Sequence, residues 1–150
     1  MNILSVRNQQ RVHRIASREF KKAATIALEQ LFQTPSYHLS VAFVTAKRMT
    51  EVNESHLQHK GPTDIIPFDY SEADVLDGEL LICPAVAAEY SQRYNVSLGR
   101  ELARYFIHGV LHLHGHDDHA PDDRRRMKRE ENRLLAQLSK RFPVDTLAHG

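Results

Sequence analysis

The segment FIHGVLHLHGHDDH, residues 106–119, places five of the ten histidines of this chain among apolar residues. If the segment is helical, His108 and His112 lie four residues apart and project side by side from one face. Two imidazoles so placed can bind one metal ion through their ring nitrogens. His114 points elsewhere around the helix. The next histidine would align only if the helix continued past Gly115, the residue type best suited to end it.

A third ligand is available directly after this glycine. Asp117, Asp118 and His119 follow Gly115 at once, where the chain turns back. Two histidines at helical spacing are usually ordinary side chains, but these interrupt an apolar stripe in which unsatisfied imidazole nitrogens would be costly. The residues therefore predict a metal site with a third ligand among these three. Three protein ligands leave a coordination position open, which is the catalytic pattern for zinc; nickel, iron or manganese also suit such donors.

The elements that must position these side chains follow from periodicity and from capping residues. Ser97 and Gly115 bound a predicted metal-bearing helix over 98–114. Pro67 interrupts a strand and indicates an edge position. Strands are predicted over 2–6, 39–44, 65–68 and 78–82, and further helices over 12–32, 45–57, 84–94 and 121–140. Helices collect at the C-terminal end, so we expect an α+β fold with a small mixed sheet, and one domain over residues 1–150.

Composition narrows the class of protein. The hydrophobic share of 41% and the charged share of 26% are those of a globular chain, and no apolar run reaches the roughly 18–20 residues of a membrane span. The N-terminus lacks the apolar core of a signal peptide. Cys83 is the single cysteine, which favours a reducing cytoplasm; we expect it in the core rather than in a reactive role.

The net charge of +1 argues against a protein that coats nucleic acid by bulk electrostatics, but it permits a local basic groove. The densest basic cluster lies in the last predicted helix, with acidic residues on both sides. Two interpretations stay open, a salt-bridged helix face and a phosphate-contacting surface. The cluster consists of Arg124, Arg125, Arg126, Lys128 and Arg129.

The pattern H-x3-H-x2-G-x2-(H/D), met by His108, His112, Gly115 and Asp118, resembles the metal helix of metzincin proteases. In those proteases a glycine turns the chain so that the third ligand reaches the metal. They also carry a glutamate general base directly after the first histidine, where this chain has Gly109. Peptide hydrolysis by that route therefore lacks its proton acceptor, and a metallohydrolase of peptides or another substrate is the weaker hypothesis.

A fuller resemblance is to the YbeY family of bacterial endoribonucleases and ribosomal-RNA maturation factors. HGVLHLHGHDD (108–118) is similar to its signature, TDIIPF (63–68) to its TDVLSF, and GELLI (78–82) to a family strand; Asn53 matches its asparagine. These matches cover about residues 40–140. The family's third histidine corresponds to Asp118, an acceptable zinc ligand, with His119 as the alternative if the turn is one residue longer.

The resemblance implies one zinc ion held by His108, His112 and Asp118. It places Thr63 and Asp64 beside the cleft, to position the substrate or orient a ligand, although hydrogen bonding at a strand end would explain them equally. Many members carry an arginine where this chain has Leu57; His59 lies nearby and could supply a donor.

The function implied is that of a zinc-dependent, single-strand-specific endoribonuclease acting in 16S ribosomal-RNA 3′-end maturation and ribosome quality control. The partners expected are ribosomal RNA and the small ribosomal subunit, with no membrane and no DNA. The alternative is a ribosome-associated maturation factor that acts by binding and whose metal is mainly structural.

Overall fold

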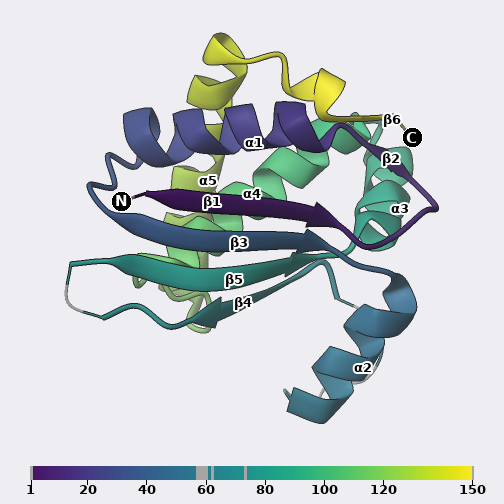
Figure 1. The fold of residues 1–150 in the computed structure, drawn as a ribbon, viewed down its shortest axis with the longest axis horizontal. Helices are drawn as coiled ribbons and strands as arrows, with labels where there is room; N and C mark the ends of the chain where they lie inside the picture. The colour runs from purple at the N-terminus through teal and green to yellow at the C-terminus, as the bar shows by residue number, and fades with distance from the viewer. Residues whose placement is uncertain (1, 57–60, 62, 73, 150) are drawn as a thin grey trace.

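A four-stranded mixed sheet forms the centre of the molecule (Figure 1). The computed structural model describes residues 2–56, 61, 63–72 and 74–149. The strands lie in the order β1 (Ile3–Asn8), β3 (Tyr37–Phe43), β5 (Leu76–Ile82) and β4 (Ile65–Asp69). The first three are parallel, and β4 runs antiparallel to β5 at the edge. Proline is tolerated at an edge because no neighbour needs its missing N–H, so the edge position predicted from Pro67 is confirmed.

The helices cover both faces of this sheet. They are α1 (Ser17–Ile26), the π-helix η1 (Ala27–Leu31), α2 (Ala46–His56), α3 (Pro84–Tyr94), α4 (Leu98–Leu113), α5 (Pro121–Arg141) and the 3-10 helix η2 (Val144–Leu147). Two short strands, β2 (Arg14–Ile15) and β6 (Ala148–His149), pair apart from the main sheet. The α+β class with a small mixed sheet is confirmed. Within the described ranges, no helix has the length and apolar composition needed to cross a membrane.

The alternation of side chains along the strands explains the two layers. Successive residues of a strand point to opposite faces, so Leu39, Val41 and Phe43 face the large core shared with α1, α4 and α5. Ala42 faces the other way, into a smaller cluster that Met49 of α2 completes. The helices with the candidate chemistry thus pack on one face, and α2 packs on the other (Figure 1).

The segment before α1 differs from the prediction of a helix from residue 12. The side-chain oxygen of Gln10 accepts hydrogen bonds from the backbone N–H groups of Val12 (3.1 Å) and His13 (2.9 Å). Arg14 and Ile15 then pair with β6. These bonds hold the backbone outside the helical conformation, and α1 begins only at Ser17.

Candidate metal centre and cavity

Helix α4 carries the two histidines along the core and ends beside the sheet. The Ser97 hydroxyl oxygen accepts a hydrogen bond from the Arg100 N–H (3.1 Å) and caps its first turn. Gly109 faces the strands so closely that a Cβ there would lie 2.7 Å from a carbon of Ile65 and 2.8 Å from a carbon of Leu80. A side chain at residue 109 would thus press on the strands, so the close packing of α4 on the sheet requires glycine here.

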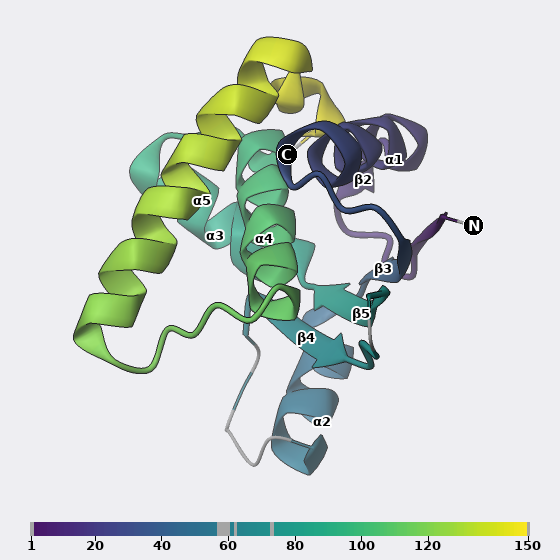
Figure 2. The same cartoon turned by 90° about the vertical axis from the view of Figure 1, so that its left-hand side faces the viewer.

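Gly115 turns the chain back after α4. Its φ of +96° lies in the region that favours glycine. The Gly115 N–H donates to the His112 carbonyl (2.9 Å), and the His116 N–H donates to the Leu111 carbonyl (3.0 Å). This pair of bonds is a Schellman motif. The following loop runs beside the end of α4 before α5 begins at Pro121 (Figure 2), which brings residues 117–119 within reach of the histidines.

His108, His112 and Asp118 come together at this point as a group that could hold a metal ion. The two Nε2 atoms lie 3.2 Å apart, and Asp118 Oδ2 lies 3.7 Å from that of His108 and 3.6 Å from that of His112. Zinc bonds of about 2.0–2.2 Å at tetrahedral angles separate ligand atoms by about 3.3–3.6 Å. The donor set therefore fits a tetrahedral divalent ion in both chemistry and spacing.

His119, the alternative third ligand, belongs to a second group, with Asp117 and Asp118, that does not include His108 or His112. Its ring Nε2 is 3.6 Å from a carboxylate oxygen of Asp117, and its side chain is 89% exposed. The geometry thus favours Asp118. The Asp118 side chain is 36% exposed, and those of His108 and His112 are 25% and 24% exposed, so the group is accessible from solvent.

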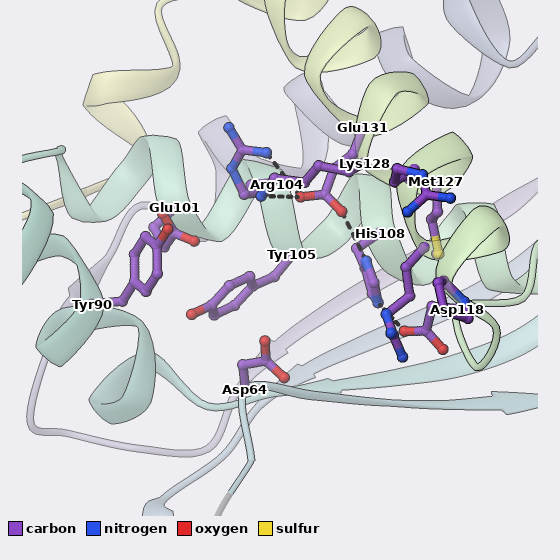
Figure 3. Close-up of a pocket in the computed structure, with 13 residues that line it drawn as sticks. Asp64, Tyr90, Glu101, Arg104, Tyr105, His108, Asp118, Met127, Lys128 and Glu131 are labelled. Carbon is purple, nitrogen blue, oxygen red and sulfur yellow. Dashed lines mark hydrogen bonds and ion pairs between the residues drawn. The ribbon is translucent and has the colours of Figure 1, made fainter.

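Glu131 of α5 orients the first histidine. Its Oε2 lies 2.8 Å from His108 Nδ1, and its Oε1 accepts a hydrogen bond from an Arg104 guanidinium N–H at 2.8 Å (Figure 3). With a proton on Nδ1, the Nε2 atom keeps a free lone pair, which faces the other candidate ligands and can bind a metal ion. Sequence reasoning missed Glu131, although it falls in the apolar stripe of α5 between Met127 and Leu134. A carboxylate within an apolar stripe indicates a buried charge that needs a partner, and this pattern could have identified Glu131 from the sequence.

The pKa values of the histidines diverge. Burial lowers the pKa of His108, but the hydrogen bond and negative charge of Glu131 outweigh burial, and the net shift is upward. Burial and then the positive charge of His108 lower the pKa of His112. The pKa of Glu131 is lowered, because its bonds to His108 and Arg104 outweigh the effect of burial. The hydrogen bond between Glu131 and His108, with the charge attraction that strengthens it when His108 is protonated, accounts for the direction of both shifts.

Thr63 and Asp64 lie at the start of β4. Asp64 Oδ1 accepts hydrogen bonds from the Thr63 hydroxyl (3.2 Å) and the Ile65 N–H (2.8 Å). Among the described residues, neither side chain hydrogen-bonds a candidate ligand. Asp64 nevertheless lines the cavity that also contains His108. Leu57, at the family's usual arginine position, and His59, the predicted substitute donor, lie outside the described residues.

Asn53, matched to the family's asparagine, is 5% exposed in α2. Its amide nitrogen donates to the Gly61 carbonyl at 2.9 Å. This bond ties α2 to the chain just ahead of Thr63.

A cavity of about 510 Å³ opens beside the metal group, between α3, α4 and α5 (Figure 3). The basic cluster of α5 forms ion pairs along its own helix, as the helix-face interpretation predicts, and phosphate contact stays a prediction. Arg125 and Arg126 pair with Asp122 and Asp123 on the same helix. Basic side chains also line the cavity next to the candidate ligands: Arg104, Arg124, Arg125 and Lys128.

The fold and this site define a small α+β protein with a mononuclear candidate metal centre. Two histidines on a helix and an aspartate after a glycine turn form this centre, beside a cavity lined by both acidic and basic side chains. The family model described as endoribonuclease YbeY matches residues 5–139. The chain therefore belongs to the YbeY family of endoribonucleases, enzymes that hydrolyse RNA.

Individual relatives agree with this assignment. An endoribonuclease YbeY of Chlorobium luteolum is 37% identical over 87% of this chain and 98% of the relative. One of Parabacteroides distasonis is 36% identical over 75% of this chain and 79% of the relative. The solution structure of a Thermotoga maritima protein is similar with a TM-score of 0.67, at 23% identity over 91% of this chain and 89% of that structure. The structural likeness supports the fold.

Proposed function

We propose that this chain is a zinc-dependent, single-strand-specific endoribonuclease. It acts on the small ribosomal subunit in the cytoplasm, in 16S ribosomal-RNA 3′-end maturation and ribosome quality control. The metal-dependent part of this proposal rests on the spacing of His108, His112 and Asp118, two of which, His108 and Asp118, line a cavity with acidic and basic walls. The choice of RNA as the substrate rests on membership of the YbeY family. We propose also that residues 1–150 form a single domain around the one four-stranded sheet.

Each side chain of the site has a role in this proposal. His108, His112 and Asp118 would hold one zinc ion, which polarises a phosphoryl oxygen and makes a coordinated water more acidic. Glu131 keeps the Nε2 atom of His108 aimed at the ion. The basic cavity residues bind RNA phosphates, since such contacts supply position and affinity without reading sequence. Asp64, braced by Thr63, positions the substrate, and His59 supplies a further hydrogen-bond donor.

The binding-factor alternative, with a structural metal, draws its support from Leu57 at the usual arginine position. Structural zinc sites are closed by four protein ligands. The group formed by the described residues offers three, and they are partly exposed. This arrangement favours the enzyme over the binding factor.

The experiment compares cleavage of a single-stranded ribosomal-RNA fragment with cleavage of the same sequence as a duplex. Purified protein with one equivalent of zinc should cut the single strand, and a chelator should abolish cutting. His108→Ala and His112→Ala should each lose at least about 100-fold, the cost of removing a group essential to transition-state stabilisation. His116→Ala is the matched control, since this exposed histidine of the same segment lies outside the metal group.

Cleavage that stays at the wild-type rate in both purified ligand variants would refute the proposal. Single-turnover conditions separate enzyme from binding factor. An enzyme converts the bound RNA to product in a metal-dependent step, whereas a binding factor retains it uncut.

A further inference from the structure

Glu101 of α4 is a buried carboxylate that the metal centre does not use. The residue is 3% exposed and lines the cavity. Among the described residues it has neither a hydrogen bond nor an ion pair, whereas Glu131, buried to a similar degree, has both Arg104 and His108 as partners. No fully enclosed side-chain oxygen among the described residues lacks a hydrogen-bond partner, so the Glu101 oxygens keep some contact with solvent. A carboxylate that gives up most of its hydration without gaining a protein donor is nevertheless costly. Burial accordingly raises the pKa of Glu101, and a ligand that brought N–H groups would offset that cost.

Glu101 lies in line with the candidate metal ligands. Residues 101, 105, 108 and 112 are spaced by four, three and four, so they share one face of the helix. At 1.5 Å per residue, Glu101 is about 10 Å along the axis from His108, a distance comparable with the reach of one nucleotide. The cavity extends along this face to Tyr105 and to Tyr90 of α3 (Figure 3). A nucleotide with its phosphate at the metal centre can therefore place its base near Glu101.

The walls around Glu101 suit a planar base. Tyr105 and Tyr90 both line this end of the cavity. Tyr90 is 40% exposed, and its ring centroid lies 4.4 Å from that of Tyr94, which is 57% exposed. Exposed aromatic rings of this kind are the platforms on which proteins stack the bases of single-stranded RNA.

The carboxylate selects among bases by its hydrogen-bonding pattern. An ionised carboxylate only accepts hydrogen bonds, and its two oxygens accept best from two adjacent donors. Guanine presents such a pair, N1–H and the N2 amino group, on its Watson–Crick edge. Adenine and cytosine set a ring acceptor beside their amino group, and uracil sets carbonyl oxygens on both sides of its single N–H. Each of the other three bases therefore brings a lone pair against the carboxylate.

We propose that this end of the cavity is a guanine-binding subsite, in which Glu101 accepts hydrogen bonds from the N1–H and N2 amino groups of a base stacked on Tyr90. Tyr105, which is buried at 6% exposure, forms the floor of this end of the cavity. Arg124 and Arg125, in the first turns of α5 after Asp118, hold the phosphate of the same nucleotide. The inference rests on the proposed endoribonuclease function for the identity of the ligand, and it adds a preferred base to a single-stranded RNA substrate.

Equilibrium binding to the zinc-loaded protein tests the subsite without reference to cleavage, because a mononucleotide has no internucleotide bond to cut. Guanosine, inosine, adenosine, cytidine and uridine 5′-monophosphates are titrated by NMR, with amide shifts of α3 and α4 as the readout. Guanosine monophosphate should bind at least about tenfold tighter than the adenosine, cytidine and uridine forms, the discrimination typical of a two-bond base contact. Inosine, which lacks the N2 amino group, should fall between. Equal affinities for guanosine and adenosine monophosphates overturn the subsite.

Variants assign the preference to named side chains. Glu101→Gln replaces one acceptor by a donor and should remove the guanine preference, whereas Glu51→Gln, an exposed glutamate of α2, should keep it. Tyr90→Ala should weaken all five nucleotides without changing their order. A guanine preference that survives Glu101→Gln in the folded protein refutes the assignment.

Cleavage separates failure of the subsite from failure of the function. Zinc-loaded wild-type protein is given oligoribonucleotides with a single guanosine, or with inosine or adenosine in its place. Cutting at a fixed offset from guanosine, slowed at least about tenfold by adenosine, supports the subsite. Equal cutting of all three substrates overturns it and leaves the nuclease intact. If no oligonucleotide is cut although guanosine monophosphate binds selectively, the proposed nuclease function fails and the subsite stands.

Discussion

Substitution of Glu131 by glutamine should weaken zinc binding by about 10- to 100-fold, the usual effect of removing a hydrogen-bond partner of a ligand histidine. This loss corresponds to about 1.4–2.8 kcal/mol. In the native chain Glu131 bonds His108 Nδ1 and an Arg104 N–H, both at 2.8 Å. Glutamine keeps the shape of the side chain but has one acceptor oxygen, so one of these donors must face its NH2 group. Either His108 loses the bond that sets its tautomer, or Arg104 loses its buried partner.

The assay is competition for zinc against a chromophoric chelator at neutral pH. Glu130→Gln is the matched control, because Glu130 is the adjacent residue and pairs with Arg133 of its own helix (2.7 Å) rather than with a ligand. Circular dichroism with excess chelator checks that both variants are folded. If a folded Glu131→Gln protein binds zinc as tightly as the wild type, the histidine is oriented by something other than this carboxylate, and the reasoning fails.

Three further outcomes follow from contacts already described. Asp118→Ala should reduce zinc affinity by at least about tenfold as a lost ligand, and His119→Ala should leave it unchanged in the same chelator assay; the reverse result would assign the third ligand to His119. Gly109→Ala should destabilise the fold by about 1–3 kcal/mol, because its Cβ would press on the strands beneath; a thermal midpoint equal to that of the wild type would contradict the packing. The hydroxyl of Tyr37 donates to Glu29, and burial first, then this bond, raises its pKa to about 12. The phenol ionises near pH 10 in the unfolded chain and near pH 12 in the folded one, so the free energy of unfolding should fall as the pH rises from 10 to 12. Denaturant titrations at pH 10 and pH 12 should show a smaller fall in this free energy for Tyr37→Phe than for the wild type. An equal fall in both proteins would refute this assignment.

The sequence was sufficient to predict the metal helix because local rules decide it. Ser97 caps its start, Gly115 ends it, and the spacing of His108 and His112 is a property of the helix itself. The edge position of β4 followed from a single proline for the same reason.

Partners from a distant helix could not be derived in this way. Glu131 reaches His108 from 23 residues away, and nothing in the local pattern of either helix shows how α4 and α5 pack. The late start of α1 was missed because β2 pairs with the last residues of the chain. The choice of Asp118 over His119 required the geometry of the loop after Gly115, where a shift of one residue exchanges the two side chains.

The placement of the metal group between α4 and the loop ahead of α5 has a consequence for the dynamics of the protein. An ion held by His108, His112 and Asp118 would act as a cross-link that closes the short loop through Gly115. The free energy of the metal–ligand bonds would offset the chain entropy lost when this loop closes. Release of the ion would then free this loop and the first turn of α5, while the sheet keeps its own hydrogen bonds and apolar core. Amide hydrogen exchange would report such a change as local opening confined to one corner of the molecule. Metal occupancy would thereby control how often the RNA-facing rim is ordered, separately from whether the domain is folded.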